Sequence, residues 1–221
     1  MTQKDKEEAL RLLTEEQLPI VAAASDLHKT AKQVVPGDGN ADAEVMFIGE
    51  APGAKEDETG KPFMGAAGKF LNELLGSIGL QREDIFIANC IKHRPPENRD
   101  PLPEEITAYA PWLQRQIDII DPKIIVTLGR FSMEFVLGPG FSISKIHGQA
   151  QSIARASLPA GRQVVMPMYH PAAALYSGKL RPVLLADFQK IPKAIELIKN
   201  PPKMETSTEG SKEADLQQRL L

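Results

Sequence analysis

Four short apolar runs constrain the fold of this chain more than any other feature. They span residues 45–48, 85–88, 124–128 and 164–168, and each is rich in β-branched or aromatic side chains. A run that is apolar at nearly every position, rather than at every second one, is typical of a strand covered on both faces. Such strands belong to parallel sheets that lie between layers of helices.

Segments with helical periodicity separate these runs. Residues 66–78 place Phe70, Leu71 and Leu74 on one side of a helix, and residues 103–120 begin with a favourable Pro-Glu-Glu first turn. The alternation of strands and helices predicts an α/β fold with a mostly parallel sheet. Further helices are predicted at residues 3–24, where Pro19 is expected to break or kink the helix, at 130–137 and at 181–199.

The length of 221 residues, with 42% apolar and 25% charged side chains, is enough for one well-buried core. We expect one domain over residues 1–199 and a flexible polar tail over 200–221. No apolar run approaches the roughly 20 residues of a membrane span, and the charged N-terminus lacks the apolar core of a signal peptide. We therefore expect a monomer in the cytoplasm, without membrane contact.

The net charge does not decide whether the chain binds nucleic acid, but the cysteine content excludes one class of metal site. A net charge of -3 neither indicates nor excludes a nucleic-acid binder, because local patches matter more than the sum. Cys90 is the only cysteine, which excludes an internal disulfide and a cysteine-only metal site.

Polar or glycine-rich segments follow all four runs. They span residues 49–53, 89–99, 129–131 and 169–173. Ligands of open parallel sheets bind outside the carboxyl ends of the strands, so we expect these segments to form one composite site. The stretch 49–68 brings backbone N–H groups and the ring of Phe63 to the end of a strand, which suits a small planar or anionic ligand.

Individual side chains in these segments have more than one interpretation. The amide of Asn89 offers a donor and an acceptor to the edge of a base, although asparagine also caps turns. The proline after His170 restricts its backbone and fixes its aim, although a lone histidine is also common on surfaces or in cores. Phe63 is either a stacking platform or a core residue, and Glu50 either orients water or is a solvated carboxylate. The acidic run 56–58 is expected to be a solvated loop rather than a metal site.

Taken together, these motifs resemble the uracil-DNA glycosylase superfamily, and specifically its family-4 type, over about residues 20–199. The resemblance implies a three-layer α/β/α sandwich with a central four-stranded parallel sheet. It also implies a monofunctional hydrolase that removes uracil from DNA and leaves an abasic site. The motifs that carry it are residues 49–53 with 56–57, Gly-Lys-Pro-Phe-Met-Gly at 60–65, Asn89 with 92–99, and His-Pro-Ala-Ala at 170–173.

The resemblance further implies roles for single residues. Phe63 stacks on an everted base, Asn89 reads the base edge, and His170 faces a pyrimidine carbonyl. Glu50, Asn89 and His170 form the catalytic set, with Glu50 or its backbone positioning the water. Ala51 stands where better-known families carry a catalytic aspartate, so the rate must depend more on stabilising the leaving group. The uracil-binding residues are Gly49, Glu50, Ala51, Phe63, Asn89 and His170.

Contacts with uracil-containing DNA are expected from basic side chains near these loops. Leu175 and Tyr176 are the candidates for a wedge that replaces the everted base. Tyr176 stands where the family often has an arginine. The residues predicted to contact the DNA backbone are Lys92, Arg94, Arg99, Lys145, Lys179 and Arg181.

Family-4 proteins typically bind a four-iron cluster through four cysteines, and this chain departs from that pattern. The corresponding positions are Ala22, Ser25, His93 and Ala110, and Cys90 cannot build a cluster alone. We therefore expect no metal and no cofactor, with ordinary packing in place of the cluster. His93 is expected to be a surface residue or a phosphate contact.

Two other functions stay open at this point. One is a glycosylase whose specificity has shifted toward another deaminated base such as hypoxanthine, because the changed cluster positions and Tyr176 indicate divergence. The other is a non-catalytic binder of damaged DNA.

Overall fold

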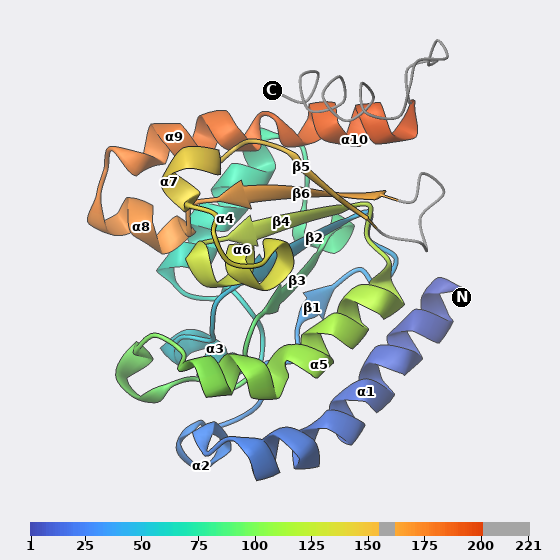
Figure 1. Ribbon diagram of the computed structural model, residues 1–221, viewed down its shortest axis with the longest axis vertical. Helices are drawn as coiled ribbons and strands as arrows, with labels where there is room; N and C mark the ends of the chain where they lie inside the picture. Colours follow the sequence, from blue (N-terminus) through green and yellow to red (C-terminus); the bar gives the residue numbers. More distant parts are fainter. Residues whose placement is uncertain (155–161, 201–221) are drawn as a thin grey trace.

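The computed structural model describes residues 1–154 and 162–200, and within these residues one sheet forms the centre of the molecule (Figure 1). Its six strands lie in the order β1-β3-β2-β4-β6-β5. The four inner strands are parallel, which confirms the predicted α/β fold and its parallel sheet. The strands are β1 (Asp38–Gly39), β2 (Val45–Gly49), β3 (Phe86–Asn89), β4 (Ile124–Leu128), β5 (Gln151–Ala154) and β6 (Arg162–Met168).

The two edge strands were not predicted. Both pair antiparallel with their neighbour, β1 with β3 and β5 with β6. β1 has only two residues, in a segment with the composition of a turn, and β5 is only partly buried. Neither segment has the apolar run that identifies a strand covered on both faces.

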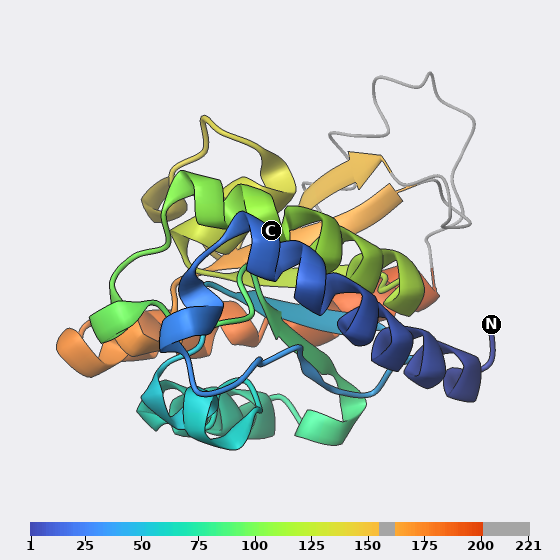
Figure 2. The same ribbon diagram turned by 90° about the horizontal axis from the view of Figure 1, so that it is seen from below.

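Helices cover both faces of the sheet, as Figure 2 shows from a second direction. The helices predicted at 103–120 and 130–137 are confirmed, and the helix predicted at 66–78 ends one residue earlier. The helices are α1 (Gln3–Ala24), α2 (Leu27–Thr30), α3 (Ala54–Thr59), α4 (Ala66–Ser77), α5 (Pro103–Ile120), α6 (Arg130–Leu137), α7 (Ile143–Ile146), α8 (Pro171–Tyr176), α9 (Leu180–Phe188) and α10 (Ile191–Lys199), with 3₁₀ turns η1 (Arg82–Asp84) and η2 (Pro96–Asn98).

Alternate residues of β2, β3 and β4 enter two separate apolar cores. Val45 and Phe47 of β2 pack with side chains of α4, α9 and α10. Met46 and Ile48 of the same strand pack on the opposite face, with side chains of α5. Successive side chains of a strand point to opposite faces, so an apolar run at every position buries both faces at once. This explains the three-layer arrangement.

Helix α1 adds a further layer outside α5. Leu13 and Val21 of α1 share an apolar cluster with Tyr109 and Trp112 of α5, and the two helices lie side by side in both views (Figures 1 and 2). A break or a kink was expected at Pro19, and the break is wrong, because α1 runs as one helix through this residue. The buried face of α1 outweighs the one backbone hydrogen bond that a proline removes.

The single helix predicted at 181–199 is also wrong. The chain forms α9 and α10 there, separated at Gln189 and Lys190. Pro192 lies in the first turn of α10, where its missing N–H removes no hydrogen bond. The apolar pattern continues across the break because both helices cover the same face of the sheet.

Two further expectations concern membrane contact and the C-terminal tail. In the ranges 1–154 and 162–200, no helix has the length and apolar composition needed to cross a membrane. The predicted tail falls almost entirely on residues 201–221, which lie outside the described residues, so its division from a domain at 1–199 stays a prediction.

Candidate active site

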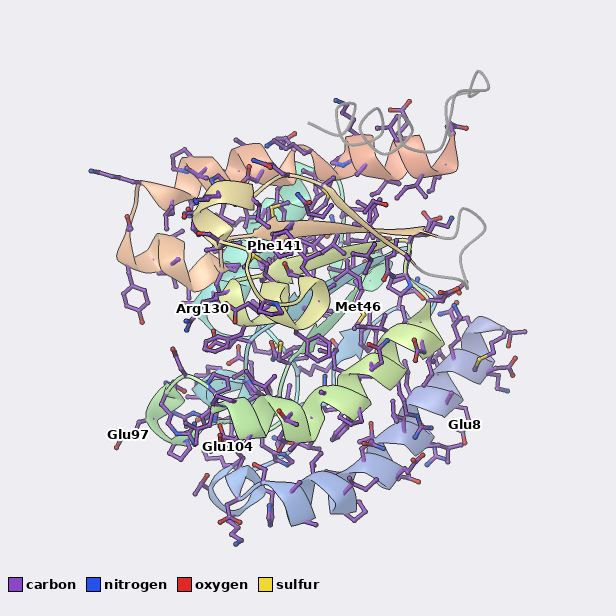
Figure 3. The ribbon with its side chains drawn as sticks, viewed as in Figure 1. Glu8, Met46, Glu97, Glu104, Arg130 and Phe141 are labelled. Carbon is purple, nitrogen blue, oxygen red and sulfur yellow. The ribbon has the colours of Figure 1, made fainter. Side chains whose placement is uncertain are left out.

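The segments that follow three of the four parallel strands, β2, β3 and β6, line a cavity of about 410 Å³. The segment after β4 does not line it, but Gly129 lies beside His170, where an added Cβ atom would be 3.2 Å from the Cβ atom of the histidine. These segments lie on the side of the molecule to which the strands point, where Figure 3 also shows Arg130 and Glu97. The structure therefore brings the separate predicted segments together at one edge of the sheet. Five of the six residues predicted to bind a base line the cavity: Glu50, Ala51, Phe63, Asn89 and His170.

Asn89 is the last residue of β3, and its side chain is buried with an exposed fraction of 2%. Among the described residues, its Oδ1 atom has no hydrogen-bond partner. A turn-capping role would require a bond from this oxygen to a nearby backbone N–H. A buried acceptor without a donor costs about 1–3 kcal/mol, so the position favours a ligand that brings an N–H group.

Gly49 is the sixth predicted residue, and it pairs with Asn89 across β2 and β3. A Cβ atom at Gly49 would lie 2.4 Å from Asn89 Oδ1 and 2.7 Å from the nearest ring atom of Phe63. Both distances are too short for non-bonded contact. Only glycine at the end of β2 therefore lets Asn89 and Phe63 face the same small space.

Phe63 and His170 form an aromatic pair beside Asn89. Their ring centroids lie 5.5 Å apart with an interplanar angle of 30°. Phe63 is buried in the core next to α4, and it also lines the cavity. Phe63 is therefore a core residue that also borders the cavity, and its role as a stacking platform stays a prediction.

His170 precedes α8, and its ring is fixed by a local hydrogen bond. Its Nδ1 atom accepts from the backbone N–H of Ala172 at 3.1 Å. Burial lowers the pKa of His170 to about 4, so the ring is neutral at pH 7. A neutral ring that accepts at Nδ1 carries its proton on Nε2, which makes Nε2 a hydrogen-bond donor.

Glu50 follows β2 directly, and its surroundings favour the protonated form. Burial raises its pKa to about 7, the negative charge of Asp100 adds to this effect, and Arg130 opposes it. Asp100 and Arg130 form an ion pair of 3.4 Å. Both were missed as site residues, although Arg130 lies within the predicted post-strand segment 129–131 and Asp100 directly follows the segment 89–99.

Glu56 connects the two halves of the glycine-rich stretch. Its carboxylate accepts from the backbone N–H groups of Gly53, Met64 and Gly65 at 3.1, 2.7 and 2.8 Å. The expectation of a solvated acidic loop is wrong, because residues 54–59 form α3 and this carboxylate replaces water with backbone donors. Glu56 thereby holds the turn after β2 against the loop that carries Phe63.

Comparisons with known proteins agree with this geometry. A family model described as "Uracil DNA glycosylase superfamily" matches residues 36–191. The chain belongs to the uracil DNA glycosylase superfamily. It is 52% identical over 162 residues to a type-4 uracil-DNA glycosylase of Sulfurisphaera tokodaii, covering 71% of this chain and 72% of the relative.

Two more type-4 uracil-DNA glycosylases place the chain in the same family. The Archaeoglobus fulgidus protein is 48% identical over 171 residues, covering 75% of this chain and 84% of the relative. The Thermotoga maritima protein is 40% identical over 188 residues, covering 84% of this chain and 94% of the relative. The chain is therefore a type-4 member of the superfamily.

Two of the basic residues predicted to bind DNA have other partners. Lys92 as a phosphate contact is wrong: it is fully buried, and its Nζ atom donates to the backbone carbonyl of Asn89 at 2.7 Å. Burial lowers the pKa of Lys92 to about 7. Arg99 lines the cavity but donates to both carboxylate oxygens of Glu105, at 2.8 and 2.6 Å. Its guanidinium thus holds the loop after η2 to the start of α5.

The other predicted DNA contacts lie on the surface. Tyr176 is 92% exposed and borders the cavity, and Leu175 is half exposed next to it on α8. Lys145 on α7 and Lys179 before α9 are exposed. Arg94 donates to Asn98 at 2.8 Å, and Arg181 lies over the ring of Phe70 and pairs with Glu73.

The positions that carry cluster cysteines in the family do not fit an iron–sulfur cluster in this chain. Ala22 and Ala110 have no ligating atom. The expectation of His93 as a surface residue or phosphate contact is wrong, because it is buried and its Nδ1 atom hydrogen-bonds the hydroxyl of Tyr109 at 2.7 Å. The same hydroxyl interacts with Ser25. The only remaining polar groups of the set are thus engaged with protein atoms.

The raised pKa of Glu50 generates a stability prediction. The folded pKa of about 7 exceeds the ordinary value of 4.5, so the folded protein binds more protons than the unfolded chain between these values. Its stability contribution is present below pH 4.5 and is lost as the pH rises to 7. We expect Glu50→Gln to exceed wild type in free energy of unfolding at pH 8, by about 1–3 kcal/mol, and to match it at pH 4.

Urea unfolding at both pH values measures this difference. Glu104→Gln, at an exposed residue of α5 (Figure 3), is the matched control. Its free energy of unfolding should equal that of wild type at both pH values. Equal stability of Glu50→Gln and wild type at pH 8 would contradict the raised pKa.

Proposed function

We propose that this chain hydrolyses the N-glycosidic bond of uracil in DNA and leaves an abasic site. The observation that carries the proposal is the unpaired Oδ1 atom of Asn89, buried in a cavity beside Phe63 and His170. The family supports it, since the relatives named above are uracil-DNA glycosylases. A base inside a duplex cannot reach such a cavity, so the nucleotide must first be everted.

Asn89 accounts for the choice of base. Its Oδ1 atom accepts from N3–H of uracil, and its amide donates to O4. Cytosine presents an acceptor at N3 and a donor at the exocyclic nitrogen, so both contacts become repulsive. A mispaired group in a buried site costs enough to discriminate strongly between two bases of nearly equal shape. Phe63 offers its ring to the everted base and offsets part of the lost stacking, by about 1–3 kcal/mol.

Bond breaking depends on stabilising the leaving base. As the bond between N1 and C1′ breaks, its electron pair stays with the base, and negative charge collects on the uracil oxygens. The neutral ring of His170 donates from Nε2 to O2 and lowers the energy of this anion, as an oxyanion donor does. Because the pKa of His170 is about 4, the ring is not an imidazolium at neutral pH, and it acts as a hydrogen-bond donor and not as an acid that transfers a proton. Ala51 supplies no carboxylate, so leaving-group stabilisation carries more of the rate.

Water completes the reaction at C1′ of the sugar. Glu50 lies at the cavity and, when ionised, accepts a hydrogen bond from this water and orients it. Because its pKa is about 7, the carboxylate is half ionised near neutral pH. The phosphates of the bound DNA help to balance the positive charge of the sugar in the transition state.

DNA engagement involves the exposed residues around the cavity. Tyr176 and Leu175 enter the space that the everted base leaves, because both are exposed apolar side chains at the rim. Arg94, Lys145 and Lys179 contact phosphates. Arg99 and Arg181 are weaker candidates, because each already pairs with a carboxylate.

The protein is further proposed to act as a cytoplasmic monomer. The single buried thiol, Cys90, is compatible with a reducing compartment.

Release of free uracil from a uracil-containing oligonucleotide tests the function. We expect wild type to produce an alkali-labile site at uracil and not at cytosine, and Asn89→Asp to lose this discrimination or to lose uracil recognition. The salt concentration must be varied, because phosphate contacts make DNA affinity steeply salt-dependent. An Asn89→Asp variant that discriminates like wild type would remove the role of Asn89. A panel with hypoxanthine separates a shifted specificity, and tight binding without base release would indicate a non-catalytic binder.

Removal of the His170 donor should slow turnover. We expect His170→Ala to reduce the single-turnover rate by roughly 10²–10³, the effect of losing one oxyanion donor. The activity of wild type should not fall between pH 6 and pH 8 as that of an enzyme with a protonated histidine acid would, because the ring of His170 is already neutral there. A rate within about twofold of wild type, measured on the same oligonucleotide, would assign leaving-group stabilisation to another residue.

The chain is also proposed to work without an iron–sulfur cluster. Iron and sulfide analysis after anaerobic reconstitution should find only trace amounts, because Ala22 and Ala110 lack ligating atoms and the ring of His93 is bonded to Tyr109. A variant carrying Ala22→Cys, Ser25→Cys, His93→Cys and Ala110→Cys is the positive control. Stoichiometric iron in the wild-type chain, with base release that a chelator abolishes, would contradict this part of the proposal.

A further inference from the structure

The backbone of Phe63 has a conformation that its side chain does not favour. Its φ angle is 54°, in the left-handed region that bulky residues rarely adopt. Such a conformation persists only where surrounding contacts determine it. The same residue borders the cavity and touches His170, so the direction of its ring depends on how this backbone is held.

Arg82 supplies contacts that hold it. This residue begins η1, far from the motifs that identify the site, and its guanidinium reaches the loop that carries Phe63. It donates to the carbonyl of Pro62 at 2.6 Å and to the carbonyl of Phe63 at 3.1 Å. A third contact, to Asn72 Oδ1 at 3.4 Å, comes from α4. A planar guanidinium can bind two neighbouring carbonyls at once, which fixes their relative orientation.

The loop is held from its other edge by Glu56. The carbonyl of Phe63 and the N–H of Met64 belong to one peptide group. Arg82 binds this carbonyl, and the carboxylate of Glu56 binds this N–H at 2.7 Å. Gly68 of α4 approaches the same carbonyl so closely that a Cβ atom there would lie 1.8 Å from its oxygen. The peptide after Phe63 therefore has little freedom to rotate.

The surroundings of Arg82 point to this role rather than to a structural ion pair. Within residues 1–154 and 162–200, no carboxylate lies within 4.0 Å of its guanidinium, although Asp38 and Glu56 act on it from longer range. The side chain is half-buried, and burial lowers its pKa. The direct partners of this half-buried cation are mainly backbone carbonyls. Its contacts therefore orient the backbone and do not neutralise a carboxylate.

We infer that Arg82 is a positioning residue that holds Phe63 in its left-handed conformation and so presents the ring to the everted base. The inference rests on the proposed function, and it assigns no contact between Arg82 and the base. Arg82 also borders an open groove with Lys61 and Lys69. A phosphate contact in that groove is the rival role, and it predicts different measurements.

The kinetic test uses Arg82→Met, Arg82→Lys, Phe63→Ala and the double variant Arg82→Met with Phe63→Ala. We expect Arg82→Met to lower the single-turnover rate at saturating DNA by about 10- to 100-fold, because misplaced contacts cost rate more than binding. The DNA concentration at half-saturation should stay within about twofold. Arg82→Lys should recover part of the rate, since an ammonium can bind one carbonyl. In the Phe63→Ala background, Arg82→Met should cost little more.

Arg115→Met is the matched control, because Arg115 is exposed on α5 and pairs with Glu16 of α1. It should leave rate and half-saturation unchanged. An equal loss from Arg82→Met in both backgrounds would overturn the inference, since the effect would not pass through Phe63. A weaker salt dependence of DNA binding with an unchanged saturated rate would overturn it in favour of the phosphate contact.

Amide hydrogen exchange tests the clamp without using activity. In Arg82→Met, the amides of Met64 and Gly65 should exchange faster than in wild type, while amides of α5 keep their rates. Unchanged exchange at both amides would overturn the inference. A wild-type protein that releases no uracil would contradict the proposed function instead, and the exchange measurement would still decide whether Arg82 holds the loop.

Discussion

Burial of both faces of the β3-β2-β4-β6 sheet is the constraint on which the remainder of this structure depends. Parallel strands covered by helices on both sides leave only their ends accessible, and all four carboxyl ends meet at one edge. Glu50, Asn89 and His170 come from three strands that are distant in sequence. They meet because the two apolar cores fix the register of the strands. If a strand shifted by one residue, each of its side chains would point to the opposite face of the sheet.

Burial at this edge shifts the ionisation of two side chains that line the cavity. Burial moves the pKa of Glu50 up and that of His170 down, so both groups approach neutrality near pH 7. A neutral donor and a partly protonated carboxyl cost less to bury than two charges. The unpaired oxygen of Asn89 is the exception, and its cost is removed only when a ligand donates to it. This cost to the free protein agrees with the proposed selectivity for a base that brings an N–H group.

The region around His93 shows how a hydrogen-bonded pair of side chains can be buried between helices without a charge. His93 and Tyr109 bond to each other within the apolar cluster that joins α1 to α5. Burial lowers the pKa of His93 to about 4 and raises that of Tyr109, so the pair stays neutral. A neutral pair satisfies two buried polar groups at once and needs no counter-ion. The same apolar cluster packs against Ala51, which lines the cavity.

The sequence by itself determined the inner strands and identified five base-site residues that line the cavity, but it missed Asp100. A strand buried on both faces must be apolar throughout, so its sequence is distinctive. Glycine, asparagine and histidine at or after the ends of such strands indicate a ligand site, because ligands bind at the carboxyl ends of parallel strands. Prediction from the sequence failed for charged side chains, whose environment depends on residues distant in the chain. Lys92 looks like a surface cation, yet the fold places it inside, against the carbonyl of Asn89. Arg82 carries no motif at all, because its partners are backbone carbonyls, which every residue type provides. Only the tertiary structure decided these roles, since a hydrogen bond to the backbone leaves no trace in the identity of its partner.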